Sequence, residues 1–398
     1  MKILFISLGC DKNLADSEEM LGLLTGNGHE IVDSEEEADA IVINTCCFIH
    51  DAKEESVNTI LEMAEYKKTG TCKILIVTGC MAQRYKEEIT EEIPEVDAVL
   101  GTTSYGDIVK ALNEAEAGHV FREFKDINAL PEDSGRRVIT TGGHFGYLKI
   151  AEGCDKHCTY CIIPSLRGKF RSVPEERLLK QAEYMASQGV RELILVAQET
   201  TVYGTDLYGK KTLHILLKKL CQIKGIRWIR VLYCYPEEIY DELIQVMKEE
   251  KKICHYLDLP IQHASDRILK RMGRRTSKAQ IVGIITKLRR EIPDIVLRTS
   301  LITGFPGETE EDHQELMEFV DEMEFDRLGV FTYSPEEGTP AETMEGQVPE
   351  ELKEERRDEI MELQQEISLE KGNNRIGQEL LVMIEGKVSG ESAYIGRT

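Results

Sequence analysis

The chain has 398 residues and a formal net charge of −23, with 49 Lys and Arg against 72 Asp and Glu, and 41% of its residues are hydrophobic. This length predicts two or three domains, and the excess of acidic residues disfavours sequence-independent binding to a polyanion. No apolar run approaches the roughly 18 residues of a membrane helix, and the start of the chain lacks the pattern of a signal peptide, so we expect a cytoplasmic protein with no membrane partner.

The N-terminal residues alternate between short apolar runs and helical patterns. Three runs are rich in β-branched and aliphatic residues and predict buried strands: Ile3 to Ser7, Ala40 to Asn44 and Lys73 to Thr78. The helical pattern after the first run ends near Gly26 or Gly28, and a second one covers about 54–68. This alternation predicts a small parallel sheet, and we assign residues 1–125 to an N-terminal α/β domain.

A second α/β unit follows a stretch with the composition of a linker. Residues 126–143 contain Pro131 and the pair Gly142 and Gly143, and we place the domain boundary there. Residues 144–345 then carry six further strand candidates separated by helical patterns: YLKI, ELILVA, WIRVLY, YLDLPI, IVLRTSLI and RLGVFTY. Such units predict a partial or full α/β barrel.

The C-terminal part begins with a charged helix. This helix covers roughly Glu350 to Lys371, inside a connecting segment that we assign to residues 346–374. Residues 375–398 could form two strands, which are too few for an independently stable domain. We expect this tail to pack on the barrel or to be the incomplete part of a small β domain.

The most specific chemical signal is the segment EGCDKHCTYCIIP, which spaces Cys154, Cys158 and Cys161 as CxxxCxxC after a predicted strand. Eleven cysteines in a chain without an export signal favour metal or catalytic use over disulfides. Three thiolates can hold three irons of a [4Fe–4S] cluster and leave the fourth open to S-adenosylmethionine (SAM). An electron delivered there would split SAM into a 5′-deoxyadenosyl radical, which can remove hydrogen from an unactivated carbon.

A zinc site formed by the same cysteines with His157 is the alternative. Structural zinc sites commonly have two separated pairs of ligands, whereas these cysteines are close together in sequence, so the spacing favours the cluster. The motif, together with the aromatic Tyr160 before the last cysteine, resembles that of the radical SAM superfamily.

Three further cysteines, Cys10, Cys46 and Cys80, follow the first three predicted strands. The carboxyl ends of parallel strands lie at one edge of a sheet, so these thiols are expected to converge and to hold a second cluster. A buried cysteine is more often a small apolar core residue, but three at equivalent strand ends favour a shared site. Cys47 is ambiguous. We assign the other cysteines to packing: Cys72, Cys221, Cys234 and Cys254.

Over nearly its whole length the chain resembles the methylthiotransferases, which have an N-terminal domain with three cysteines, a radical SAM barrel and a TRAM domain that is only begun here. The segment SLGCDKNLADSE around Cys10 is similar to the RimO type, whereas the tRNA-modifying MiaB type usually has a GCQMN-like segment. Three other segments also resemble the RimO type: LYCYPEEI at 232–239, YLDLPIQHAS at 256–265 and YSPEEGTPA at 333–341.

This resemblance implies an activity and its partners. The enzyme would place a methylthio group on the β-carbon of an aspartate in small-subunit ribosomal protein number twelve. It would use two [4Fe–4S] clusters, two molecules of SAM, an electron donor of the flavodoxin or ferredoxin type, and a sulfur donor. No side-chain general base is required.

Two segments at strand ends are candidates for holding SAM. Gln198 and Glu199, in VAQETT, follow the second barrel strand, where a carboxylate could receive the SAM ammonium. Gly304 and Gly307, in GFPGET, follow the fifth, where glycine permits close approach of the backbone to a ligand. With Tyr160 these residues form the expected cofactor-binding set, and simple tight turns are the alternative explanation.

Two other functions stay open. A tRNA methylthiotransferase would apply the same chemistry to an adenosine, but it should show a basic stripe, and the basic segments 269–275 and 288–291 are more typical of solvated helix faces. A non-enzymatic two-cluster electron carrier would be reduced without cleaving SAM. The barrel is larger than electron transfer alone needs.

Overall fold

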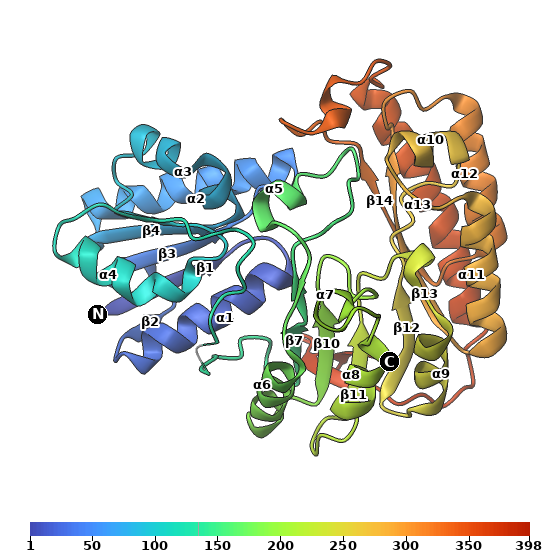
Figure 1. Cartoon of the computed structure of the whole chain (residues 1–398), viewed down its shortest axis with the longest axis horizontal. Helices are drawn as coiled ribbons and strands as arrows, with labels where there is room; N and C mark the ends of the chain where they lie inside the picture. Colours follow the sequence, from blue (N-terminus) through green and yellow to red (C-terminus); the bar gives the residue numbers. More distant parts are fainter. Residues whose placement is uncertain (134) are drawn as a thin grey trace.

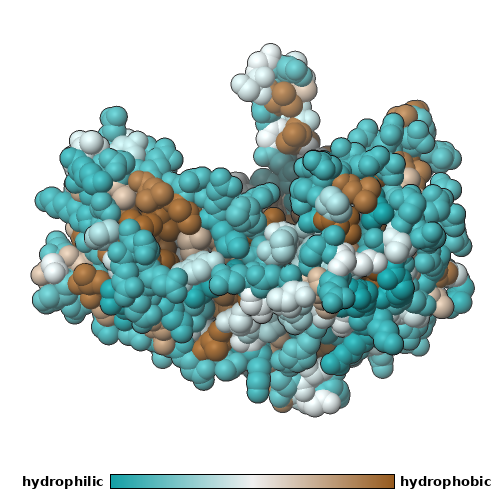
Figure 2. Space-filling model, turned by 90° about the horizontal axis from the view of Figure 1, so that it is seen from above, coloured by the Kyte–Doolittle hydropathy of each residue, from teal (hydrophilic) through white to brown (hydrophobic). Residues whose placement is uncertain are grey.

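The structure is a computed structural model that describes residues 1–133 and 135–398, and it has two α/β lobes joined along one side (Figure 1). The N-terminal lobe holds one parallel sheet and the second lobe holds another, with a long helix and a two-stranded tail at the C-terminal end. Seen from above, the surface is mainly hydrophilic, with a hydrophobic area on each lobe (Figure 2).

The N-terminal sheet has six parallel strands in the order β2-β1-β3-β4-β5-β6. The strands are β1 (Lys2–Ser7), β2 (Glu30–Val32), β3 (Ala40–Thr45), β4 (Ile74–Gly79), β5 (Ala98–Leu100) and β6 (Phe121–Glu123). The helices between them are α1 (Asp11–Gly26), α2 (His50–Thr69), α3 (Cys80–Glu92) and α4 (Ile108–Glu116). Apolar residues pack on both faces of the sheet, so β3 and β4 are buried at every residue, which explains their unbroken apolar runs.

The sequence prediction found β1, β3 and β4 and missed β2, β5 and β6. Each missed strand has only three residues, too few to show a periodic pattern. The predicted parallel sheet is confirmed. It is wider than expected because these short strands extend both of its edges.

The second sheet also has six parallel strands, in the order β14-β13-β12-β11-β10-β7. They are β7 (Phe145–Lys149), β10 (Glu192–Val196), β11 (Trp228–Val231), β12 (Ile253–Asp258), β13 (Val296–Thr303) and β14 (Arg327–Thr332). The terminal strands β7 and β14 do not pair with each other, so the partial barrel of the two predicted alternatives is the correct one. Along β13 buried and half-buried residues alternate, which shows that only one face of the strand packs into the core.

Helices complete the second lobe. They are α6 (Glu175–Ser187), α7 (Thr205–Tyr208), α8 (Leu213–Leu220), α9 (Asp241–Glu249), α10 (Asp266–Arg271), α11 (Lys278–Glu291), α12 (Glu310–Met323) and α13 (Glu350–Asn373). Capping boxes at Ser277 and Thr309 fix the starts of α11 and α12. The long helix α13 packs on β14 and places Ile360 and Ile367 in the barrel core.

The segment that we expected to be a linker is tied to the N-terminal lobe. Arg137 Nε donates to Glu18 Oε2 at 2.8 Å, and the backbone N–H of Thr140 donates to Glu18 Oε1 at 2.7 Å. Glu18 is fully buried in α1. The Tyr184 hydroxyl of α6 donates to the carbonyl of Arg137 at 2.7 Å, so Arg137 contacts both lobes, while the domain limits themselves stay predictions.

The tail forms an antiparallel pair, β15 (Met383–Lys387) and β16 (Tyr394–Arg397). Arg397 Nη2 lies 2.9 Å from Glu192 Oε2 at the start of β10, so the tail does contact the barrel. In the part of the chain that the structure describes, no helix is both long enough and apolar enough to cross a membrane.

Candidate active site

Cys10, Cys46 and Cys80 lie at the carboxyl edge of the N-terminal sheet. They follow β1, β3 and β4, which are neighbours in the sheet, and β1 and β3 flank the point where the strand order reverses. This is where open α/β sheets bind their ligands. Burial raises the pKa of the Cys46 thiol to about 11, with further contributions from Cys80 and Cys10, so the three sulfurs are close enough to repel one another as thiolates.

Glycine permits this close approach of the three chain segments. Gly9 has φ +88°, and a Cβ there would stand 2.7 Å from Cβ of Cys46. Gly79 has φ +94°, and a Cβ there would collide with the side chain of Asn44 and the backbone of Thr45. A side chain at either position would push the cysteine loops apart.

Cys10, Cys46 and Cys80 are called the first triad below. Asn13 connects this triad to the rest of the lobe. Its Nδ2 donates to the carbonyl of Leu8 at 3.1 Å and to that of Thr45 at 2.9 Å. Its Oδ1 lies 3.8 Å from Sγ of Cys80 and accepts from Arg167 Nη2 at 2.5 Å. The amide therefore holds two of the cysteine loops in place.

The cysteines outside the two triads are found mostly in the core. Cys47, which the sequence left ambiguous, is fully buried in an apolar cluster, and burial raises the pKa of its thiol. Three of the four that we assigned to packing are buried as expected: Cys72, Cys221 and Cys234. Cys254 is half-buried.

The second triad consists of Cys154, Cys158 and Cys161, in the loop between β8 (Ala151–Glu152) and α5 (Ile163–Arg167). β8 pairs with β9 (Arg171–Ser172), so the loop is closed at its base. Burial raises the pKa of Cys154 to about 11 and that of Cys161 to about 12, and Cys158 raises both further. Cys158 thus interacts electrostatically with both other thiols, and the assignment of the three as cluster ligands stays a prediction.

The separation of the thiols bears on the choice between a zinc ion and a cluster at this loop. In the described residues, no group of three or more His, Cys, Asp or Glu side chains is drawn close enough to hold one metal ion. A cluster differs in that each cysteine binds a different iron, so its thiolates stand farther apart. Cys46 and Cys80 at the first site and Cys154 and Cys158 at the second are buried, whereas Cys10 is exposed and Cys161 is half-buried.

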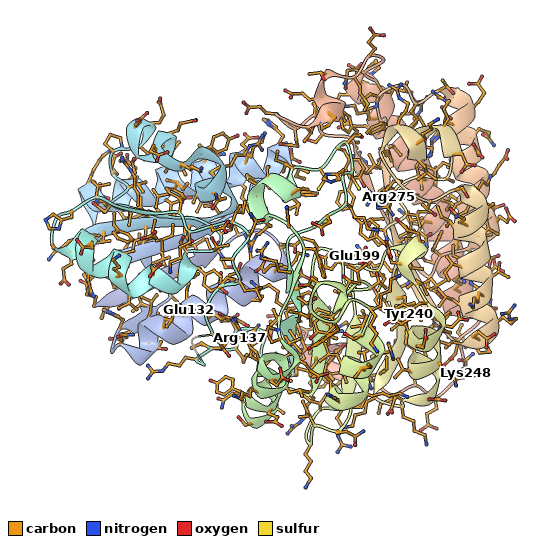
Figure 3. All side chains as sticks on the ribbon, in the orientation of Figure 1. Glu132, Arg137, Glu199, Tyr240, Lys248 and Arg275 are labelled. Carbon is orange, nitrogen blue, oxygen red and sulfur yellow. The ribbon has the colours of Figure 1, made fainter. Side chains whose placement is uncertain are left out.

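Glu199 lies close to the second triad, in the middle of the molecule (Figure 3). Its Oε1 accepts from the backbone N–H of Thr201 at 3.0 Å, but in the described part of the chain neither its Oε2 nor Oε1 of Gln198 has a hydrogen-bond partner. Burial raises the pKa of Glu199 to about 7, against the opposing effects of Thr201 and Lys156. An orphaned buried carboxylate beside the triad suits a cationic ligand group.

Arg274 is a site residue that the sequence reasoning missed. The basic segment 269–275 was expected to be a solvated helix face, but Arg274 is buried, with its guanidinium 4.3 Å from the ring of Tyr235. It interacts electrostatically with Cys158, and its Nε and Nη1 have no partner among the described residues. Arg274 stands among other basic residues in the sequence, so no sequence pattern indicated that it is buried.

The remaining predicted cofactor residues are placed less favourably. Tyr160 packs its ring edge against Phe305 at 6.3 Å, next to the second triad, and burial raises its pKa. A Cβ at Gly304 would meet the side chain of Lys353, and one at Gly307 would stand 3.0 Å from Arg271. Protein side chains thus occupy the space beside both glycines, and their role in binding SAM stays a prediction.

A buried ionic network connects the two triads. Arg167, at the end of the helix after the second triad, pairs with Asp16 at 2.8 Å and interacts electrostatically with Cys80 of the first. Lys149 pairs with both Asp16 and Glu152. Burial alone would raise the pKa of Glu152, but Lys149 and Arg167 outweigh it and lower that pKa to about 2. The network ties α1 of one lobe to the cluster loop of the other.

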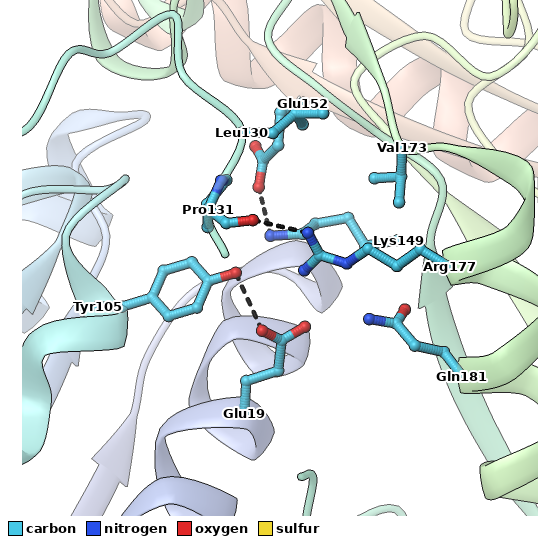
Figure 4. Close-up of a pocket in the computed structure, with 9 residues that line it drawn as sticks. All are labelled: Glu19, Tyr105, Leu130, Pro131, Lys149, Glu152, Val173, Arg177 and Gln181. Carbon is cyan, nitrogen blue, oxygen red and sulfur yellow. Dashed lines mark hydrogen bonds and ion pairs between the residues drawn. The ribbon is translucent and has the colours of Figure 1, made fainter. Parts of the chain in front are cut away.

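The same network borders a small pocket between the lobes (Figure 4). There Tyr105 donates to Glu19 Oε2 at 3.1 Å, and Arg177 donates to the carbonyl of Pro131 at 2.6 Å. Lys149 points into the same space, as Figure 4 shows. Side chains of both lobes line this pocket, and the ion pair of Lys149 with Asp16 beside it joins the lobes.

Comparisons with known proteins agree with this division into two lobes. Residues 2–101 match a family described as "Uncharacterized protein family UPF0004", and residues 148–320 match the radical SAM superfamily. A protein of Lachnoclostridium phytofermentans named ribosomal protein uS12 methylthiotransferase RimO is 65% identical over 398 residues, all of this chain and 90% of that protein. One of the same name from Clostridioides difficile is 51% identical, over all of this chain and 89% of that protein.

Solved structures with similar folds are more distant in sequence. The radical SAM methyltransferase TsrM from Kitasatospora setae superposes with a TM-score of 0.61 at 12% identity, covering 86% of this chain and 74% of that one. The cobalamin-dependent radical SAM enzyme OxsB gives a TM-score of 0.57 at 15% identity, covering 92% of this chain and 56% of that one. These similarities concern the fold alone.

Proposed function

This chain belongs to the RimO family of radical SAM methylthiotransferases, and from that premise we propose that its substrate is an aspartate of ribosomal protein uS12, to whose β-carbon it adds a methylthio group. The relatives that cover the whole chain carry this name, which favours the protein substrate over tRNA. The radical SAM domain implies one [4Fe–4S] cluster and SAM. The second cluster is part of the proposal.

The proposal is supported by two sets of three cysteines, one after neighbouring strands of the N-terminal sheet and one in the loop between β8 and α5. Burial raises the pKa of Cys46 in one triad and of Cys161 in the other, and Arg167 from the loop of the second triad interacts electrostatically with Cys80 of the first. An electron carrier would need no such joint between a cluster loop and a partial barrel. Two sites connected in this way suit a reaction that joins the products of both.

Cys154, Cys158 and Cys161 would hold the radical SAM cluster, and Cys10, Cys46 and Cys80 the second one. When bound, the clusters and SAM supply an electron, a hydrogen-abstracting radical and methylated sulfur. The chain's own side chains bind and orient the cosubstrate. Both the electron donor, of the flavodoxin or ferredoxin type, and the sulfur donor are further proposed partners.

Two buried, incompletely paired groups of opposite charge define how SAM would be held. Glu199 would accept the ammonium of the SAM methionine, because its Oε2 has no partner in the described chain. Arg274 would receive the carboxylate, because its Nε and Nη1 are likewise unpaired there. Each ligand group would satisfy a polar atom that otherwise pays the full cost of burial.

The test uses anaerobically reconstituted protein with SAM and a reductant. Incubation with recombinant uS12 should yield a peptide heavier by one methylthio group in place of hydrogen at a single aspartate, together with 5′-deoxyadenosine. Cys154→Ala should abolish both products. The same mass change on tRNA instead would select the MiaB-type alternative, and cluster reduction without any deoxyadenosine would select the electron carrier.

A further inference from the structure

Lys12 forms a contact between the lobes that the mechanism above does not use. It lies in the first turn of α1, two residues after Cys10, and only 7% of its surface is exposed. Its Nζ stands 3.4 Å from the centroid of the Tyr233 ring, which follows β11 of the partial barrel. The Lys12 ammonium therefore lies where α1 of the N-terminal lobe meets the barrel lobe, and it interacts electrostatically with Cys10. Figure 1 shows α1 on the side of its lobe that faces the barrel.

Tyr233 is fixed in an unusual conformation that brings its ring to this position. Its φ is +59°, in the left-handed region that non-glycine residues rarely occupy. Its backbone N–H donates to Asp258 Oδ2 at 3.1 Å, and its carbonyl accepts from the backbone N–H of Thr200 at 3.1 Å. Arg298 in turn donates to the other oxygen of Asp258 at 2.6 Å. Strained residues that their surroundings hold this firmly are typical of functional sites.

Lys12 has one anionic side-chain partner within ion-pair distance among the described residues, its sequence neighbour. Asp11 Oδ1 lies 2.9 Å from Lys12 Nζ, and the same oxygen accepts from the Tyr233 hydroxyl at 3.1 Å. An ammonium has three donors, so one carboxylate and one ring face leave capacity for another acceptor. By contrast, Arg167 and Lys149 are fully engaged in the buried network of Asp16 and Glu152.

The proposed substrate needs a cation at such a place. The carboxylate of an aspartate is bonded directly to the β-carbon that reacts, so it must enter the space between the two thiol triads. Burying a carboxylate there without a partner would be strongly unfavourable, the more so in a chain of net charge −23. Lys12 is the cation that stands next to Cys10 and reaches across to the barrel.

We propose that Lys12 binds the side-chain carboxylate of the substrate aspartate, and that Tyr233 and Asp258 are positioning residues that hold the ammonium toward the incoming side chain. Without substrate, Asp11 is the anionic partner of the Lys12 ammonium, and the substrate carboxylate would bind the ammonium beside it. The inference rests on the proposed function and adds a selection rule to it: the enzyme accepts a carboxylate and discriminates against a neutral side chain.

The experiment crosses two enzymes with two substrates. Reconstituted wild type and Lys12→Met are titrated anaerobically, with SAM present, against fluorescently labelled uS12 and against uS12 in which the target aspartate is replaced by asparagine. The wild type should bind the aspartate form about 10- to 100-fold more tightly, the range expected for a charged hydrogen bond. Lys12→Met should lose most of that preference, and Lys12→Arg should keep most of it.

A matched control separates charge recognition from general effects. Lys248→Met removes a lysine on the outer side of the barrel lobe and should leave the preference for aspartate intact (Figure 3). Iron content of each variant checks that the triads still hold their clusters. This control matters because Lys12 lies so close to Cys10.

Three results would overturn the inference. The first is equal binding of both forms of uS12 by the wild type, a result that does not depend on the folding of any enzyme variant. The second is Lys12→Met with an unchanged preference, and the third is an equal loss of affinity for both forms, which would make Lys12 a structural contact. If the wild type binds neither form, the proposed function itself fails, and the inference with it.

Discussion

Replacing Glu199 by glutamine tests both the electrostatics of the barrel site and its proposed role. The substitution keeps the shape of the side chain, and the amide oxygen can still accept from the backbone N–H of Thr201. It removes a buried charge whose second oxygen has no partner in the described chain. Stability and SAM affinity should therefore change in opposite directions.

The magnitude follows from the pKa of the carboxyl group. Burial raises it from 4.5 to about 7, which corresponds to about 3 kcal/mol at 1.36 kcal/mol for each pH unit. Because the folded state binds the proton more tightly than the unfolded state, the wild type loses this stability as the pH rises from about 4.5 to about 7. Glu199→Gln should escape the loss and gain up to about 3 kcal/mol at about pH 8.

The assay is urea denaturation of the cluster-free protein at several pH values, followed through the near-ultraviolet signal of the barrel lobe. The advantage of the variant should be absent at about pH 4.5 and largest above about pH 7. Glu183→Gln, an exposed carboxylate on α6, is the control and should show no such dependence. SAM should bind Glu199→Gln about 10- to 100-fold more weakly than the wild type.

Two results would refute this reasoning. A difference in stability that does not vary with pH would show that the buried charge is not its cause. Undiminished affinity for SAM would remove Glu199 from the binding site, whatever its effect on stability.

Three further predictions concern the joint and the two triads. Arg167→Met should lower the free energy of unfolding by about 3 to 5 kcal/mol in thermal or urea denaturation, because Asp16 and Glu152 lose a buried cation. Gly79→Ala should destabilise the chain by about 1 to 3 kcal/mol and reduce the iron bound after reconstitution from about eight to about four per chain, because it displaces Cys80. Arg274→Gln should weaken SAM binding about 10- to 100-fold in calorimetry without changing the iron content.

Each of these has a neighbour or analogue as its control. Gly118 has a positive φ of +81°, like Gly79, but a Cβ there would meet nothing within 4 Å. Gly118→Ala should therefore lower the stability through backbone strain and leave the iron content unchanged. Arg275 is exposed beside Arg274, and Arg275→Gln should bind SAM normally. Loss of iron in Gly118→Ala, or equal SAM affinity in the two arginine variants, would contradict the assignments.

Much of the fold could be predicted from the sequence, because local hydrophobic patterns mark the longer strands and helices. Unbroken apolar runs mark strands covered on both faces, and they located β3 and β4 to within a residue or two at each end. The short edge strands β2, β5 and β6 carry no such pattern and were missed. Whether the barrel closes was left open, since closure depends on how β7 and β14 lie relative to each other.

By itself the sequence determined which chemistry this protein can host. The CxxxCxxC spacing predicted a radical SAM site, and the radical SAM domain agrees with it. The position of Cys10, Cys46 and Cys80 after parallel strands predicts a second set of converging thiols, because strand ends share one edge of a sheet. Only the tertiary structure decided which charged residues accompany them. Arg274 looks like any basic surface residue along the chain, and Tyr233 meets Asp11 across 222 positions. Such contacts arise from the packing of one lobe on the other, which no local pattern records.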